Sequence, residues 1–301
     1  MFPCKVGSAW EILAPAKLNL HLEVKGTLSG GFHELETLMV PVRIFDQLRW
    51  KAGESLKLRI RNFESPTRSD RQPRYSVEND LVLRAVRLLA KTAKVEPTGT
   101  WDLWKRIPMQ AGLGGGSSDA AAALVLANHC WGIGQSHQQL AELASEIGSD
   151  VPFFLAGGPA ICRGRGEQVE HASGLPKMHF VVAKPALGLS TESVFAEFDQ
   201  MLDKRIKTPS NCNSLLEALR RGAIAEAGQW MTNRLESAAR RLSPWMERLA
   251  VFFERCRCLG HLMTGSGSAY VGVMRSAAQA RAVARKLSGW DLESALATSN
   301  C

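Results

Sequence analysis

The sequence predicts an α+β protein with two domains, which we place at residues 1–175 and 176–301. Three observations lead to this fold class. The chain has 301 residues, enough for two domains of about 100–200 residues each. Its first part is rich in segments where apolar and polar residues alternate, which is the period of a half-buried strand. Later the apolar spacing becomes mainly helical, and strands followed by helices around a few strands are typical of α+β domains.

The elements of the first domain follow from spacing and from cap residues. Leu18 to Lys25 and Leu35 to Ile44 have the two-residue period, and Ser136 followed by Gln139 has the spacing of a capping box. In chain order we expect strands at 18–25, 35–44, 56–60 and 101–107, a helix with Asn79 as its N-cap, a helix opened by Ser117, Ser118 and Asp119, and a helix from Ser136 to about Ile147.

The second domain begins after short strands that are separated by glycine-containing turns. Its first strand is a buried apolar run, and helical spacing then dominates. In chain order we expect a strand at 178–184, helices at 192–202, 213–219, 223–231 and 244–253, strands at 260–263 and 269–274 joined by a glycine loop, and a closing helix at 277–287.

Charge narrows the class of partner. The net charge of +8 and the isoelectric point near 9.3 fit either nucleic-acid binding or attraction of an anionic small substrate. The basic residues are dispersed, and their densest stretch contains prolines and a serine, which favours a solvated strand edge and loop. We therefore expect a small-molecule partner and no nucleic acid. The residues of that stretch are Arg59, Arg61, Arg68, Arg71 and Arg74.

Cysteine usage and apolar runs bear on the compartment. Seven scattered cysteines predict reduced, mostly buried thiols, and the close pair Cys256 and Cys258 offers at most two metal ligands. No apolar run approaches the roughly 20 residues that span a bilayer, and Met1 to Trp10 lacks an apolar signal core. We expect a cytoplasmic protein with no membrane partner.

A glycine-rich motif, PMQAGLGGGSSDAA from Pro108 to Ala121, is the strongest functional signal. Backbone N–H groups of a glycine loop and the positive end of a helix dipole both stabilise phosphate. The motif therefore predicts a cradle for a triphosphate. It is not a Walker A loop, because no Lys-Ser/Thr pair follows the last glycine, and it lacks the pattern of a dinucleotide fingerprint. The alternative is a flexible loop that ends in a serine N-cap; we expect Ser117 and Ser118 to cap the helix in either case.

Other candidate residues each have a plain structural alternative. Lys17 stands at a strand start, where a solvated edge lysine is the commoner case. Asp150, followed by Pro152, is either a functional acid or only a helix N-cap. His33 is either functional or a structural histidine, and Gly265-Ser266-Gly267 is a second glycine loop that a tight hairpin also explains.

The order of these segments resembles that of the GHMP kinases. APAKLNL matches the first motif of this family, PMQAGLGGGSSDAAA the second and MTGSGSAYVG the third. Within the family the chain is most similar to the kinases of the non-mevalonate isoprenoid pathway that act on 4-diphosphocytidyl-2-C-methyl-D-erythritol. The segments GFHELETLM and GSDVPFFLAGGPAICRGRGE carry this closer likeness. The resemblance runs from about Trp10 to Arg285 and is thinnest from Leu202 to Met231.

The resemblance implies a fold and a set of residue roles. The fold is the two-domain GHMP kinase fold, with a ribosomal protein S5 domain 2-like N-terminal domain, a ferredoxin-like C-terminal domain and the site in the cleft between them. Lys17 and Asp150 match the catalytic pair of the family. The ATP loop is matched by Pro108, Met109, Gln110, Ala111, Gly112, Leu113, Gly114, Gly115, Gly116, Ser117 and Ser118, and the cytidine and erythritol site by Asn19, Phe32, His33, Thr191 and Phe195.

The implied activity is ATP-dependent phosphorylation of the 2-hydroxyl of this diphosphocytidyl alcohol, giving the 2-phosphate and ADP. We expect Asp150 to orient or deprotonate the acceptor, and Lys17 to pair with Asp150 and stabilise charge on the γ-phosphate. Ser117 and Ser118 are the candidate ligands of Mg²⁺. We expect Phe32 and Phe195 to sandwich the cytosine and His33 to hydrogen-bond its edge, unless Phe195 is a core residue of its helix. We expect a monomer or a weak homodimer.

Departures and alternatives remain. The chain has Gly30-Gly31-Phe32-His33 where the family has Asp-Gly-Tyr-His, and Asn233-Arg234-Leu235-Glu236 where the family has Asn-Asp-Leu-Glu. Both departures bear on substrate affinity rather than on the reaction. The alternatives are a homoserine or mevalonate type of GHMP kinase and a non-catalytic nucleotide-binding relative. A basic RNA-binding protein is a third, which no aromatic-interleaved basic stripe supports.

Overall fold

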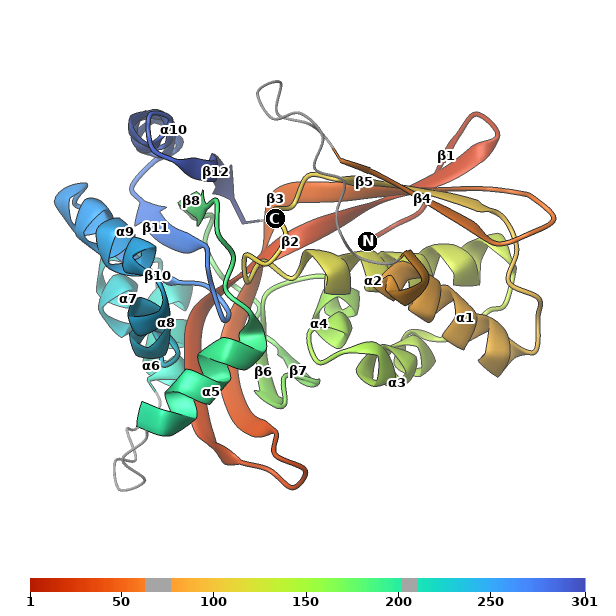
Figure 1. The fold of residues 1–301 in the computed structure, drawn as a ribbon, viewed down its shortest axis with the longest axis horizontal. Helices are drawn as coiled ribbons and strands as arrows, with labels where there is room; N and C mark the ends of the chain where they lie inside the picture. Colours follow the sequence, from red (N-terminus) through yellow and green to blue (C-terminus); the bar gives the residue numbers. More distant parts are fainter. Residues whose placement is uncertain (63–76, 202–210, 301) are drawn as a thin grey trace. The chain divides into compact units, whose positions relative to one another are not determined.

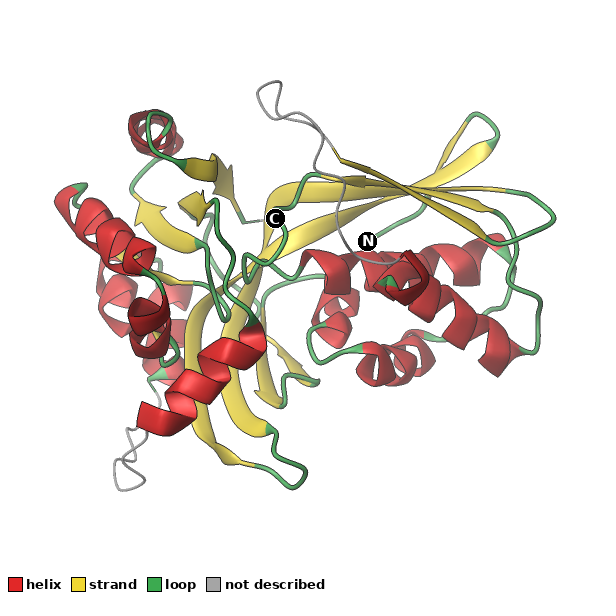
Figure 2. Cartoon of the chain, in the orientation of Figure 1, coloured by secondary structure: helices red, strands yellow, loops and turns green. Residues whose placement is uncertain are grey.

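The computed structural model describes residues 1–62, 77–201 and 211–300. The chain divides into two compact units, each built from three stretches of sequence. Unit 1 holds Met1–Ala16, Ile44–Ile107 and Gly114–Gly157, and unit 2 holds Lys17–Arg43, Pro108–Leu113 and Gly158–Cys301. Both units mix helices and strands (Figure 2), so the predicted α+β class is confirmed. These units follow packing, and the domain limits 1–175 and 176–301 stay a prediction.

Unit 1 combines strands with a group of helices. Its strands are β1 (Cys4–Val6), the start of β2 (Ala9–Thr27), the end of β3 (His33–Lys51), β4 (Lys57–Asn62) and β5 (Thr100–Lys105). β5 pairs antiparallel with β3 and parallel with β4. Its helices are α1 (Leu81–Ala93), α2 (Gly115–Cys130), α3 (His137–Ile147) and α4 (Val151–Ala156), with a 3-10 turn at Val77–Asn79. α2 contacts the other three helices, and its residues from Ala120 to Ala123 are fully buried.

Unit 2 is built on a second, four-stranded antiparallel sheet with the strand order β10-β11-β8-β12 (Figure 1). Its strands are the end of β2, the start of β3, β6 (Ala160–Gly164), β7 (Gln168–His171), β8 (His179–Pro185), β9 (Thr232–Asn233), β10 (Gly260–Met263), β11 (Tyr270–Met274) and β12 (Leu292–Ser299). Its helices are α5 (Thr191–Met201), α6 (Cys212–Arg220), α7 (Ile224–Ala227), α8 (Glu236–Leu242), α9 (Pro244–Arg255) and α10 (Ala277–Leu287), with a 3-10 turn at Gly228–Trp230. α9 packs on β10 and β11, and α10 on β8 and β12, around a core that includes Met246, Phe253 and Tyr270.

Three helix starts test the predicted caps. The capping box at Ser136 is confirmed, with both reciprocal hydrogen bonds formed. The N-cap of α1 is Asp80, whose carboxylate accepts from the N–H of Val82 at 2.8 Å; the prediction of Asn79 was wrong by one residue. α2 begins at Gly115 with Gly114 as its N-cap and no side-chain cap. The capping role predicted for Ser117 and Ser118 is therefore wrong, because the glycine at 114 adopts a left-handed conformation with φ of 69° and starts the helix earlier.

Two strands are longer than predicted. β2 and β3 each have 19 residues, and the residues of β2 from Ala16 to Glu23 are buried without interruption. The polar residues Asn19, His21 and Glu23 are buried along with the apolar ones, so the two-residue period of Leu18 to Lys25 does not mark the ends of this strand. None of the helices in the described ranges is long and apolar enough to cross a membrane.

Candidate functional site

The three sequence motifs meet inside unit 2 through main-chain hydrogen bonds. The N–H of Lys17, in the first motif, donates to the carbonyl of Leu113, in the second, at 3.0 Å. The carbonyl of Ala111, also in the second motif, accepts from the N–H of Ala269, in the third, at 3.2 Å. Segments far apart in the sequence thus form one hydrogen-bonded group. We call it the motif cluster, and it comprises residues 17–19, 110–113 and 264–269.

Two glycines let the backbones of the motif cluster approach closely. Both have positive φ, 72° at Gly112 and 56° at Gly265. A Cβ on Gly112 would lie 2.1 Å from the carbonyl oxygen of Thr264, and a Cβ on Gly265 would lie 2.9 Å from the carbonyl oxygen of Gly112. The same Cβ on Gly265 would lie 3.3 Å from Nζ of Lys17. Only glycine satisfies both the conformation and the space, so the third motif is more than a tight hairpin.

Lys17 is buried, with 3% of its surface exposed. The alternative of a solvated edge lysine is therefore wrong. Nζ of Lys17 donates to Oδ1 of Asn19 at 2.6 Å. Burying an ammonium costs free energy that hydrogen bonds and opposite charge must offset, so this position indicates a specific role for the lysine.

Asn19 is fixed on all sides within unit 2. Its N–H donates to Oγ1 of Thr264 at 3.0 Å, its Oδ1 accepts from the same hydroxyl at 3.3 Å, and its Nδ2 donates to Oγ1 of Thr37 at 2.8 Å. With Oδ1 also bound to Lys17, the described contacts use the amide to orient the ammonium. Contact of Asn19 with a substrate stays a prediction.

The side chain of Asn233 hydrogen-bonds to the backbone of the third motif. Asn233 was not predicted as a site residue. Its Nδ2 donates to the carbonyls of Met263 and Gly265, both at 2.8 Å, and its Oδ1 accepts from the N–H of Leu235 at 3.0 Å. Glu236 accepts from the N–H of Met263 at 3.0 Å. The sequence carried the signal for this pair, because Asn233 and Glu236 belong to the segment that was compared with the family's Asn-Asp-Leu-Glu.

The first turn of α2, in unit 1, contains the second half of the glycine-rich motif. The N–H of Ser118 is the first to bond back along the helix, to the carbonyl of Gly114 at 2.9 Å. The N–H groups of Gly115, Gly116 and Ser117 therefore stand at the helix end, where no partner exists inside the helix. This end is the positive pole of the dipole of a 16-residue helix and suits an anion.

Oxygen atoms on the same turn fit a magnesium ion. Ser117 is half-buried, and Ser118 is buried. Oγ of Ser118 has no hydrogen-bond partner in the part of the chain that the structure describes. Because Mg²⁺ prefers oxygen ligands, the donor set suits the ion, and the roles of Ser117 and Ser118 as its ligands stay a prediction.

A buried lysine lies beside this turn and was not singled out from the sequence. Lys105, at the end of β5, contacts the carboxylates of Asp46 and Asp119. Asp46 and Asp119 are 59 and 14 residues away from Lys105, so no local sequence motif predicts that the three side chains meet.

Asp150 occupies the N-cap position of α4, in unit 1. Its side chain makes no capping hydrogen bond, although Pro152 stands at the start of the helix as predicted. The carboxylate is half-buried. The alternative that Asp150 serves only as a cap therefore loses its main support.

The residues predicted to bind the cytidine lie together in unit 2. The rings of His33 and Phe195 are stacked, with centroids 4.6 Å apart and planes at 25°. Nε2 of His33 lies 2.8 Å from Oδ1 of Asp199, so the imidazole has a carboxylate partner. Phe32 is 52% exposed, and the guanidinium of Arg165 lies 5.0 Å from its ring centroid. His33 covers one face of Phe195, so a cytosine between the two phenylalanines requires the other face or a turn of the imidazole; the sandwich stays a prediction.

The core alternative for Phe195 receives little support. The buried side of α5 is formed by Val194 and Phe198, whereas Phe195 is only half-buried against the core. Thr191, at the start of α5, is exposed and shares a hydrogen bond of 2.7 Å with the hydroxyl of Ser266 in the third motif. Both predicted residues of α5 are thus accessible from outside the core.

One further cluster brings metal-ligand types together. Ligand atoms of His21, Glu36 and Cys212 lie within 4.8 Å of one another in unit 2. Two cations, Lys25 at 3.4 Å and Arg163 at 3.1 Å, already contact Glu36. Burial raises the pKa of the Cys212 thiol to about 12, and a thiol in that state is a poor metal ligand. The cluster fits a buried ion-paired group better than a metal centre.

The described cysteines and basic residues test two further predictions. None of the described cysteines forms a disulfide, but only Cys162 and Cys212 are buried, so the prediction of mostly buried thiols is wrong. Arg59 and Arg61 lie exposed on β4, and Arg61 is 3.6 Å from the carboxylate of Asp102. The remaining members of the basic stretch, Arg68, Arg71 and Arg74, lie outside the described residues.

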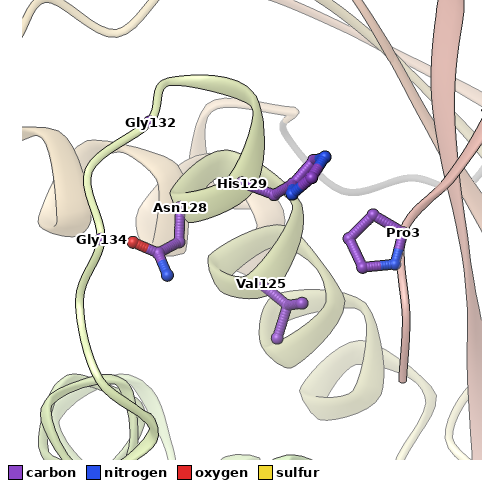
Figure 3. A pocket seen from close by; sticks show the side chains of 6 residues that line it. All are labelled: Pro3, Val125, Asn128, His129, Gly132 and Gly134. Atoms are coloured by element: carbon purple, nitrogen blue, oxygen red, sulfur yellow. The ribbon is translucent and has the colours of Figure 1, made fainter.

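A hollow in unit 1 (Figure 3) is lined by Pro3, Val125, Asn128, His129, Gly132 and Gly134. It adjoins the C-terminal end of α2. At 1.5 Å per residue, this end is roughly 15–20 Å from the glycine-rich start of the helix. The hollow therefore plays no part in the group of residues described above.

Comparisons with known proteins match both halves of the chain. The model of the GHMP kinases N terminal domain matches residues 80–158, and that of the GHMP kinases C terminal matches residues 215–290. The 4-diphosphocytidyl-2-C-methyl-D-erythritol kinase of Pelotomaculum thermopropionicum is 35% identical, over 91% of this chain and 92% of the relative. The enzyme of the same name from Salinispora arenicola is 36% identical, over 96% of this chain and 91% of the relative.

Two solved structures are also similar to this chain. A crystal structure of 4-(cytidine 5'-diphospho)-2C-methyl-D-erythritol kinase has a TM-score of 0.79 and 33% identity, and the match covers 97% of this chain and 99% of that one. The mevalonate kinase of L. major has a TM-score of 0.73 at 16% identity, covering 99% of this chain and 98% of that one, which shows a shared fold alone.

Proposed function

We propose that this chain, which belongs to the GHMP kinases and within them to the 4-diphosphocytidyl-2-C-methyl-D-erythritol kinases, phosphorylates the 2-hydroxyl of 4-diphosphocytidyl-2-C-methyl-D-erythritol with ATP. The products are the 2-phosphate and ADP, and the reaction serves isopentenyl diphosphate biosynthesis. The observation that carries the proposal is the motif cluster, in which all three kinase motifs are hydrogen-bonded around the buried Lys17. The names of the relatives support the choice of substrate.

The nucleotide binds through the second motif. Its triphosphate accepts hydrogen bonds from the N–H groups of Gly115, Gly116 and Ser117 at the positive end of α2. Gly116 leaves this end open, because a Cβ there would meet only Leu81, at 3.4 Å. In this proposal the N–H groups and the helix dipole stabilise the triphosphate, so the loop needs no lysine of the kind that a Walker A loop has.

Phosphoryl transfer requires alignment and neutralisation of charge rather than covalent help from the protein. The ammonium of Lys17, held by Asn19 at 2.6 Å, stabilises charge on the γ-phosphoryl group as it moves. Asp150, whose side chain makes no capping hydrogen bond, orients the acceptor hydroxyl or takes its proton. A magnesium ion supplies further neutralisation of the phosphate charge, with Ser117 and Ser118 as the residues that would hold it.

The acceptor binds through aromatic and polar groups of unit 2. Phe195 and Phe32 offer ring faces to the cytosine, and His33, oriented by Asp199 at 2.8 Å, offers a hydrogen-bonding nitrogen to its edge. Arg165, placed over Phe32, adds positive charge next to a substrate that carries a diphosphate. In this chain the guanidinium accompanies a phenylalanine where the family usually has a tyrosine.

ATP consumption on a panel of acceptors tests the proposal. The purified protein is given 4-diphosphocytidyl-2-C-methyl-D-erythritol, homoserine or mevalonate, and ADP release is followed. We expect turnover with the diphosphocytidyl alcohol alone. Equal turnover on homoserine or mevalonate would move the chain to another branch of the family. Asp150→Asn, prepared in the same way, controls for contaminating ATPases.

Several properties stay predictions within this proposal. They are the use of Mg²⁺, a cytoplasmic location, and a monomeric or weakly dimeric state without nucleic-acid partners.

A further inference from the structure

Lys105 is buried between two carboxylates of unit 1. The side chain is at the end of β5 and 9% of the residue surface is exposed, against 0% for Asp46 and 3% for Asp119. Nζ of Lys105 donates to Oδ2 of Asp46 and, at 2.5 Å, to Oδ2 of Asp119. One ammonium is thus shared by two acids that come from different elements, β3 and α2.

The two acids lie at opposite ends of the glycine-rich motif. Oδ1 of Asp46 accepts from the N–H groups of Arg106 and Ile107, at 2.5 and 2.8 Å, where the chain enters the motif. Asp119 lies on α2, where the chain leaves it. The ammonium of Lys105 therefore ties the start of α2 to the backbone that precedes the motif.

The first residue of α2 packs directly on this group. A Cβ on Gly115 would lie 3.0 Å from Cγ2 of Ile107 and 3.4 Å from Nζ of Lys105. Glycine at position 115 thus lets the first turn of α2 start close to Ile107 and Lys105, so a displacement of either residue reaches the helix end and its N–H groups.

Stability alone does not account for such a group. Replacing buried ion pairs by apolar residues is often neutral or stabilising, because both charges lose their hydration. Here the balance is worse than for a simple pair, since two carboxylates share one ammonium. A buried group of this kind next to a phosphate cradle indicates a role in the geometry of the cradle.

We propose that Lys105, with Asp46 and Asp119, is a positioning residue for the nucleotide: it holds the N–H groups at the start of α2 in the arrangement that a triphosphate requires. Lys105 touches neither substrate in this role. The proposal rests on the proposed function only through the use of ATP, and it is independent of which acceptor is phosphorylated.

Calorimetric titration with ATP, in the absence of any acceptor, tests the proposal on the whole protein. Asp119→Ala removes the acceptor on α2 while Lys105 keeps Asp46, and we expect the Kd for ATP to rise about 10–100-fold. Asp119→Asn keeps an oxygen that accepts from the ammonium and should bind ATP almost as tightly as the wild type. In steady-state kinetics of Asp119→Ala, the KM for ATP should rise, and kcat and the KM for the acceptor should stay close to wild type.

Lys184→Met is the matched control. Lys184 is 1% exposed in unit 2 and donates to the carbonyl of Pro185 at 2.7 Å and to Glu293 at 3.1 Å. Its loss removes a buried ammonium far along the chain from the motif, so the thermal midpoint should fall while the Kd for ATP stays unchanged. An unchanged Kd in both Asp119→Ala and Lys184→Met would overturn the proposal and leave Lys105 with a structural role.

A charge-balanced variant keeps the test decisive where Asp119→Ala does not fold. Lys105→Met with Asp119→Asn leaves one carboxylate, Asp46, which still accepts from Arg106 and Ile107. It should fold and bind ATP weakly; wild-type affinity would refute the positioning role. Wild-type protein that binds ATP but phosphorylates no cytidine alcohol would refute the proposed function and leave the positioning role intact.

Discussion

The regions around two buried lysines, Lys17 in unit 2 and Lys105 in unit 1, differ in the partner that each ammonium meets. Inside its unit Lys17 donates to the neutral amide oxygen of Asn19, whereas Lys105 donates to two carboxylates. Within unit 2 the amide of Asn19 fixes the direction of the Lys17 ammonium, whereas in unit 1 two acids hold the Lys105 ammonium in place. We therefore assign Lys17 to the moving phosphoryl group and Lys105 to the geometry of the nucleotide cradle.

The pKa of Lys105 supports this division. Burial by itself lowers the pKa of the ammonium, but the charges of Asp119 and Asp46 outweigh burial and raise it above the ordinary value of 10.5. Lys105 is therefore charged at any physiological pH. Its substitution should affect nucleotide binding, and that of Lys17 should affect turnover.

Lys17→Met should give the largest effect. Loss of the charge that stabilises the moving phosphoryl group should cut kcat by about 10²–10³. The Kd for ATP should change little, because the cradle of α2 remains. Steady-state kinetics together with ATP titration check both halves of the expectation. Near-normal kcat with a raised Kd would reverse the roles assigned to the two lysines.

Phe195→Ala should weaken binding of the acceptor without changing the roles of Lys17 and Lys105. Loss of a stacking face should raise the KM for the cytidine substrate by an amount equivalent to about 1–3 kcal/mol. The KM for ATP should stay the same. If both constants rise, or if the protein loses solubility, Phe195 belongs to the core of α5 instead.

Thr264→Val tests whether Asn19 orients Lys17. The hydroxyl of Thr264 accepts from the N–H of Asn19 and donates to Oδ1 of Asn19, so its loss loosens the side-chain amide that orients Lys17. We expect a fall in kcat equivalent to about 0.5–1.5 kcal/mol, the value of one hydrogen bond. Thr264→Ser keeps the hydroxyl and should restore kcat. A rise in the KM for ATP with unchanged kcat would contradict the role given to Asn19.

Asp119→Asn gives the smallest effect, visible in the pH dependence of stability. Burial raises the pKa of Asp119 in the folded state, so the folded protein holds this proton more tightly than the unfolded chain does. The contribution of the group is present below the ordinary pKa and is lost as pH rises through the raised value. The free energy of unfolding of the wild type, minus that of the variant, should therefore fall in urea titrations as pH rises above about 4, the ordinary pKa of an aspartate. A difference that rises with pH would contradict the raised pKa of Asp119.

Local signals in the sequence predicted much of the fold. The capping box at Ser136 and the closing helix 277–287 are confirmed, because both depend on residues a few positions apart. The helix expected at 223–231 is instead α7 followed by a 3-10 turn. Gly228, where α7 ends, packs so closely that a Cβ there would lie 1.7 Å from the carbonyl oxygen of Leu259. β12 was not expected, and the strand exists because its backbone pairs with β8 along the edge of the sheet.

In the candidate site, too, the sequence predicted local features but not the contacts between distant segments. Motif order located Lys17 and the glycine-rich motif, but the closeness of the motifs depends on hydrogen bonds between distant segments. Lys105 and Asp46 are 59 residues apart, so no spacing rule connects them. Gly115 was expected to be glycine for the sake of phosphate alone. The structure adds a packing reason, because a Cβ there would press on Ile107 at 3.0 Å.

The most direct test of the account is the ³¹P NMR spectrum of the product formed from ATP and 4-diphosphocytidyl-2-C-methyl-D-erythritol. Carbon 2 of this substrate bears a methyl group and no hydrogen. A phosphate on its hydroxyl should therefore give a new monoester resonance without coupling to a proton on that carbon, with one ADP formed for each monoester. A proton-coupled monoester would place the phosphate on another hydroxyl. ADP formed without any monoester would contradict the assignment as a kinase of this alcohol.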